Sequence, residues 1–212
     1  MADRPVFVSA GVAERATDAL GTEPTAVAAV ALVVALGLLR TYAGPELLGL
    51  RFVTFWATAR RIFMPAVDRV AKRAVGVPAE NHAPVEEFVG DSSLSPREVA
   101  DRLQRVTDRR FEVSVLSGLK TDWEDNEEIA SVVAYDGPKP WPGAPFWLKP
   151  AQYHVTMFDA DGATRVTAHF ESNSWRPDKW RDHLWKGETF DAQKGVDQVR
   201  EWLSLPEFSQ DS

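Results

Sequence analysis

Two histidines and a glutamate fall where the facing strands of a hairpin would bring them together. His154 lies in the segment QYHVTMF, and His169 and Glu171 lie in the segment VTAHFES. Between these segments stands Asp161-Gly162, a two-residue turn signal that sets the pairing of the flanking strands. That pairing places His154 directly opposite His169, with Glu171 one step along the same face.

Two imidazoles and a carboxylate on adjacent strands are a donor set that zinc accepts, because a catalytic zinc site needs only three protein ligands. His154, His169 and Glu171 are therefore candidate metal ligands. The alternative is a polar sheet face that points to solvent or to a partner, since threonine and arginine side chains alternate onto the same face. No spaced metal signature accompanies the three residues. The sequence itself implies no cofactor, and both interpretations stay open.

The remaining catalytic signatures are missing from the 212 residues. There is no cysteine, which excludes disulfides, thiolate metal sites and cysteine nucleophiles. The sequence also lacks a P-loop, a glycine-rich dinucleotide fingerprint, a nucleophile elbow and a His-Glu metalloprotease helix. No catalytic residue is assigned, and a non-enzymatic function is favoured.

Two loops carry unusual compositions. Residues 136–150, DGPKPWPGAPFWLKP, combine five prolines with Trp141, Phe146 and Trp147. These aromatic residues form a candidate partner-binding loop, and the alternative is a stiff crossover whose rings cap the core. Residues 121–128, TDWEDNEE, are predicted to be a solvated acidic loop rather than a calcium site, because they lack the glycine and the spacing of an EF-hand.

An α+β domain over 94–206 should position these residues. A helix is expected to begin at Ser95, where Pro96 takes the first helical position and Glu98 can complete a capping box. Alternating apolar residues predict four antiparallel strands, with helices on one face of the sheet. The predicted strands lie at 111–115, at 127–135 and in the two arms of the hairpin, and further helices are predicted at 177–186 and 190–204.

The hairpin register follows from its apolar faces. The turn pairs Tyr153 with Phe170, Val155 with Ala168 and Met157 with Val166. A slip of one residue would place apolar side chains opposite polar ones, so the register is well determined.

Charge is distributed unevenly along the chain, whose net charge is −7. Residues 46–74 carry six bases and two acids, whereas residues 75–212 carry 15 bases and 25 acids. An acidic domain disfavours nucleic-acid binding, because phosphate contacts supply most of that affinity. Residues 75–93 are acidic and rich in proline without a period, so they are predicted to be a linker, and residues 207–212 to be a tail.

The N-terminal segment 1–45 contains the apolar run TAVAAVALVVALGLLR at 25–40. It has no polar face at helical spacing, and the segment from 24 to 44 is long enough to cross a bilayer. Arg40 could extend to the headgroups while Tyr42 lies at the interface. We expect a transmembrane helix at about 24–44. A buried core helix and a signal peptide are the alternatives.

A basic amphipathic helix is predicted over 46–74, next to this span. Beside a membrane it would lie among the lipid headgroups, and the alternative is a helix packed on the protein's own core. Because the bases follow the apolar run, the positive-inside rule places the N-terminus outside and the large domain in the cytoplasm. The predicted membrane-interface residues of this segment are Arg51, Trp56, Arg60, Arg61, Arg69, Lys72 and Arg73.

These features favour a membrane-anchored, non-enzymatic scaffold or assembly protein. Its expected partners are membrane lipid and a protein, or further copies of itself. Arginine outnumbers lysine 17 to 7, which suits a salt-loving or high-GC host. A structural protein of a membrane-containing virus, with the domain on the inner face of the viral membrane, would fit the same features. The alternatives are a soluble or peripheral binding domain and a metal-dependent enzyme that uses His154 and His169.

Overall fold

The structure is a computed structural model, and it describes residues 35, 49–62, 65, 82–114, 119–173, 176 and 190–205. The predicted helix at 177–186 lies outside these residues, as does the predicted span at 24–44 apart from Ala35. Within the described part of the chain, no helix combines the length and the apolar character that crossing a bilayer requires.

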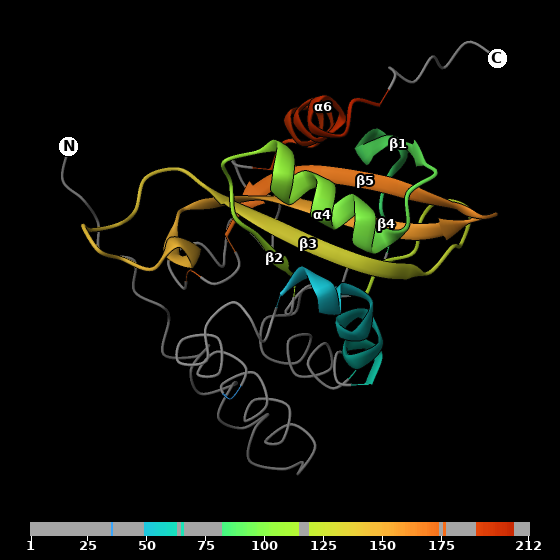
Figure 1. Cartoon of the computed structure of the whole chain (residues 1–212), viewed down its shortest axis with the longest axis horizontal. Coiled ribbons are helices and arrows are strands. Elements are labelled where there is room, and N and C mark those ends of the chain that lie inside the picture. Colours follow the sequence, from blue (N-terminus) through green and yellow to red (C-terminus); the bar gives the residue numbers. More distant parts are fainter. Residues whose placement is uncertain are drawn as a thin grey trace, which may run out of the picture.

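Five antiparallel strands form one sheet, in the order β1-β5-β4-β3-β2 (Figure 1). The fold is therefore α+β as predicted, but the sheet has one strand more than the four expected. The strands are β1 (Phe88–Ser92), β2 (Phe111–Val113), β3 (Glu128–Asp136), β4 (Ala151–Ala160) and β5 (Ala163–Ser172).

The β4–β5 hairpin has the predicted register. Val155 pairs with Ala168 and His154 pairs with His169. Asp161 and Gly162 form the turn, with φ angles of 48° and 88°. Both residues are left-handed, as a two-residue turn that follows the twist of the strands requires. The local turn chemistry and the alternating apolar pattern thus agree with the observed pairing.

Helix α4 (Pro96–Val106) begins at the predicted capping box. The Ser95 hydroxyl accepts a hydrogen bond from the Glu98 amide at 3.4 Å, and the Glu98 carboxylate accepts one from the Ser95 amide at 2.9 Å. These two bonds satisfy amide groups that a helix leaves without partners at its start.

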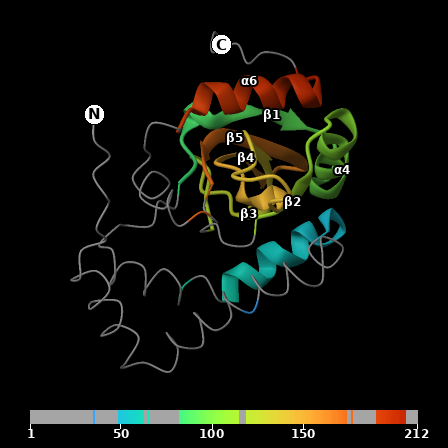
Figure 2. The same cartoon turned by 90° about the vertical axis from the view of Figure 1, so that its left-hand side faces the viewer.

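Helices α4 and α6 (Ala192–Leu203) contribute to the same hydrophobic core on the apolar face of the sheet. Val99 and Leu103 of α4, and Val199 of α6, are fully buried or nearly so. Gly195 of α6 lies so close to β5 that a Cβ atom there would be 2.3 Å from the Cα of His169. In Figure 2, α6 runs along the β1–β5 side of the sheet, and α4 lies toward its β2–β3 side.

The edge strand β1 lies within the segment 75–93 that was predicted to be a linker. It pairs with β5, and a register shift between Phe88 and Gly90 interrupts the ladder. Val89 is fully buried in the core. The linker prediction is therefore wrong for these residues, because an irregular edge strand has neither the length nor the alternation that marks a strand in a sequence.

A helix at 53–62 packs against the domain below the β2–β3 edge in Figure 2. Val53 and Trp56 belong to the hydrophobic core. The guanidinium of Arg60 forms an ion pair with Glu128 of β3, and both side chains are 1 % exposed. This burial favours the second interpretation of the basic helix, in which it packs on the protein's own core.

Candidate functional site

The polar face of the β4–β5 hairpin brings the three predicted metal ligands together. His154 lies opposite His169, and Glu171 follows on β5. All three are buried, with 4 %, 3 % and 6 % of their surface exposed. The alternative of a face that points to solvent is therefore wrong, since these side chains lie inside the protein.

Glu171 is the centre of this cluster. Its carboxylate oxygens lie 3.3 Å from Nδ1 of His154 and 3.3 Å from Nε2 of His169. Its Oε1 also accepts a hydrogen bond of 2.8 Å from the amide of Gln152. The other nitrogen of His154 lies 2.7 Å from the hydroxyl of Ser131 on β3. The cluster therefore joins three neighbouring strands through polar side chains.

A second carboxylate and a lysine extend the cluster beyond the hairpin. Oε2 of Glu87 lies 2.9 Å from Nδ1 of His169 and 3.7 Å from the ammonium of Lys120. Glu87 is 1 % exposed, although it falls in the segment that the sequence predicted to be a linker. Glu87 and Lys120 carried no signal in the sequence, because only tertiary contacts bring them to the histidines.

The two histidines differ in their electrostatic surroundings. Burial lowers the pKa of His154 to about 4, and the neighbouring Glu171 opposes this shift. Burial and Lys120 also disfavour a charge on His169, but the carboxylates of Glu171 and Glu87 outweigh them and raise its pKa. His154 is thus neutral at neutral pH, whereas a proton on His169 would balance the two carboxylates together with Lys120.

The geometry of the donors is compatible with a single metal ion. One ligand atom each from His154, His169 and Glu171 lies within 4.8 Å of the others. Two imidazoles and a carboxylate suit zinc, which would act there as a Lewis acid or as a structural link between β4 and β5. The same atoms also form the hydrogen-bonded and ionic cluster described above, and metal binding stays a prediction.

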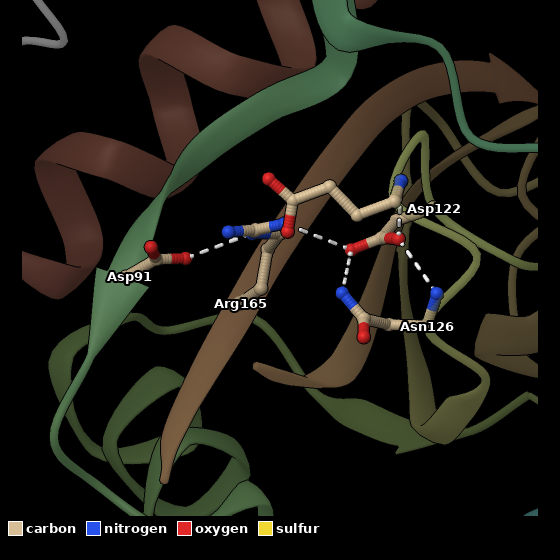
Figure 3. Close-up of polar contacts among 5 residues, drawn as sticks. Asp91, Asp122, Asn126 and Arg165 are labelled. Atoms are coloured by element: carbon tan, nitrogen blue, oxygen red, sulfur yellow. Dashed lines mark hydrogen bonds and ion pairs between the residues drawn. The ribbon is translucent and has the colours of Figure 1, made fainter. Parts of the chain in front are cut away.

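The acidic loop 121–128 is organised by Arg165 of β5 (Figure 3). Its guanidinium contacts Asp91 and Asp122 at 3.1 Å each and Glu124 at 2.6 Å. Asp122 is fully buried and accepts hydrogen bonds of 2.9 Å from the backbone and the side chain of Asn126. Some of the carboxylates predicted to be solvated are therefore buried. The guanidinium of Arg165 lies between the carboxylates, where a bound metal ion would otherwise have to lie.

The aromatic loop 136–150 divides into an outward and an inward part. Trp141 is 55 % exposed, whereas Phe146 packs edge-on against Tyr135 at a ring distance of 5.7 Å. The backbone carbonyl of Trp147 accepts a hydrogen bond of 2.7 Å from Asn173. Phe146 thus has the structural role of a crossover residue, while Trp141 remains available to a partner.

Beside this loop lies a pocket of about 400 Å³ that the sequence did not indicate. Four cations line it, and they come from the segment before β2 and from the loop 136–150. Its lining residues include Arg109, Arg110, Lys139, Lys149, Asp108 and Phe146.

The predicted membrane-interface residues have different positions. Trp56 and Arg60 are buried within the protein, while Arg51 and Arg61 are exposed. The remaining five, Arg40, Tyr42, Arg69, Lys72 and Arg73, lie outside the described residues.

The chain matches no family model, no curated protein and no solved structure.

Proposed function

We propose that this protein is a membrane-anchored, non-enzymatic scaffold or assembly protein. The segment 24–44 anchors it, with the N-terminus outside and the α+β domain at the inner surface. A protein partner or further copies of the chain bind the domain there. A structural role in a membrane-containing virus of a salt-loving host is one form of this function.

The apolar run at 25–40 supports the anchor, and the packing of the helix at 53–62 against the domain supports a fixed link between that helix and the domain. Arg60 and Glu128 form a buried ion pair, and Val53 and Trp56 join the hydrophobic core. A helix held in this way cannot act as a loose tether, because moving it would expose its apolar side chains and separate two buried charges.

The chain between the apolar run and this helix is short. A chain extends at most about 3.5 Å per residue, so Gly49 lies within about 30 Å of Arg40. A domain fixed to the helix at 53–62 would therefore stay close to the membrane surface. Such restricted placement suits an assembly role better than a freely moving catalytic domain.

Alkaline carbonate washing of membranes that contain the full chain tests the anchor. We expect the protein to remain in the pellet. Replacing Val33 and Val34 with arginine should release it, because each arginine at the centre of a span costs about 3 kcal/mol, whereas replacing both with leucine should not. Complete release of the unaltered protein by carbonate would refute the proposed anchor.

A second candidate function, metal binding, is favoured by the spacing of the donor atoms in His154, His169 and Glu171. Purified full-length protein would then contain about one equivalent of zinc, and replacing both histidines with alanine would remove it. Protein that takes up no zinc after dialysis against the metal would exclude this function.

A further inference from the structure

The pocket beside the aromatic loop concentrates positive charge on an acidic protein. Arg109, Arg110, Lys139 and Lys149 line it, and Asp108 is the only acid among the lining residues that the structure describes. The whole chain, by contrast, carries a net charge of −7. A concave site of the opposite sign attracts anions and raises their local concentration.

Acidic side chains pair with both arginines of the pocket. Arg109 forms an ion pair with Asp136, and Nε of Arg110 lies 3.6 Å from a carboxylate oxygen of Glu112. Among the residues that the structure describes, Lys139 and Lys149 form no ion pair. The ammonium of Lys149 donates to the carbonyl of Tyr135 at 3.4 Å, which leaves two of its three donors for a ligand.

The pocket wall also orients one guanidinium. The Cζ atom of Arg110 lies 4.5 Å from the centre of the Phe146 ring. This cation–π contact keeps the guanidinium beside the ring, and a guanidinium carries N–H donors that match phosphate oxygens. A phosphate accepts several charge-assisted hydrogen bonds at once, so it fits a mixed set of arginine and lysine donors better than a single carboxylate does.

We propose that this pocket binds a phosphate group. The group could belong to a soluble phosphate ester or to the headgroup of an anionic lipid, and the lipid source rests on the membrane function proposed above. Trp141 lies on the same loop and is 55 % exposed. Tryptophan is favoured at the headgroup level of a bilayer, so the loop could place the pocket and Trp141 together at the membrane surface.

Binding is measured on the full-length protein in nanodiscs. In discs of phosphatidylcholine, the soluble probes are inorganic phosphate and glycerol 3-phosphate, followed by calorimetry. Saturable binding of either probe identifies a soluble source. For the lipid source, brominated lipid is included in the discs as a quencher of tryptophan fluorescence. The quenching in discs that contain phosphatidylglycerol is compared with the quenching in discs of phosphatidylcholine. Quenching that requires the anionic lipid identifies a headgroup.

The variant Arg110→Gln/Lys149→Gln should weaken whichever interaction is found by at least tenfold. The matched control is Arg97→Gln/Arg105→Gln, which removes the same charge from the exposed side of α4 and should change binding less than twofold. Lys139→Glu, at an exposed position, provides a second pocket variant that should not affect folding.

Absence of binding to all probes, or equal losses in the pocket and control variants, would overturn the phosphate site. Carbonate extraction tests the anchor separately. A protein that stays in the pellet but binds no phosphate would disprove this inference and leave the proposed function intact.

Discussion

Replacing Glu128 with glutamine should release the helix at 53–62 from the domain. Arg60 has its guanidinium at the Glu128 carboxylate, and both side chains are 1 % exposed. Burial raises the pKa of Glu128, and Arg60 opposes that shift. Glutamine has nearly the same shape and can still accept the 3.1 Å hydrogen bond from the amide of Lys120, so the substitution removes mainly the negative charge.

The expected cost follows from the charge that remains. Arginine does not lose its proton at any accessible pH, and removing one partner of a buried ion pair costs about 3–5 kcal/mol. This is a large share of the total stability of an ordinary domain, about 5–15 kcal/mol. The cost applies to the packing of the helix first, because Arg60 can reach water if the helix alone moves away.

Hydrogen exchange measured by mass spectrometry on the full-length protein separates local from global opening. Since about 1.4 kcal/mol corresponds to a tenfold change, exchange of the amides at 53–62 should accelerate at least a hundredfold in Glu128→Gln. The matched control is the adjacent Glu127→Gln. Glu127 is 73 % exposed and pairs with Arg61 at 3.1 Å, so its loss should cost less than about 1 kcal/mol.

The double variant Arg60→Met/Glu128→Leu distinguishes charge from packing. A buried ion pair replaced by apolar residues of similar volume is often neutral or more stable by about 1–4 kcal/mol. The double variant should therefore protect the helix at 53–62 better than Glu128→Gln does. If Glu128→Gln behaves like Glu127→Gln, or if the double variant exchanges faster than the single one, the pair does not hold the helix.

Three further predictions concern single positions. Burial raises the pKa of Asp122, but its hydrogen bonds outweigh burial and hold the pKa below 3.8. The stability it contributes is therefore present above pH 3.8 and is lost as the pH falls through the lower folded pKa. In Asp122→Asn, the free energy of unfolding in urea should fall less steeply as the pH is lowered. An unchanged dependence of this free energy on pH would contradict the prediction. Ser95→Ala removes the cap of α4 and should cost about 1 kcal/mol in urea unfolding, a loss that Glu98→Gln should not reproduce in full. Gly195→Ala should destabilise the protein by about 1–3 kcal/mol, because its Cβ would lie 2.3 Å from the Cα of His169, and an unchanged melting temperature would show that α6 can shift.

The parts of the fold predicted correctly depend on neighbours in sequence. The turn at Asp161-Gly162 and the alternation on either side of it are local, and they sufficed to place His154 opposite His169. The capping box at Ser95 is equally local. Where a few adjacent residues decide the backbone geometry, the sequence pattern predicts both the element and its register.

The burial of the polar face could not be predicted in this way. Thr156 and Thr167 alternate with apolar residues as on a solvated strand, yet both are 1 % exposed. What surrounds the histidines includes Glu87 and Lys120, which come from distant segments. The cationic pocket has the same origin, because its lysines and arginines come together only in the folded chain.

The basic helix illustrates why composition alone leaves the environment of an amphipathic helix undecided. An apolar stripe beside arginines suits a lipid surface and a protein surface equally well. The partner of Arg60 decides between them for the residues at 53–62, and Glu128 is separated from it by 68 positions. Arg51 and Arg61 on the same stretch remain exposed. The helix therefore uses its buried side to hold the domain while Arg51 lies on its exposed side, so packing on the core is compatible with the proposed contact with a membrane.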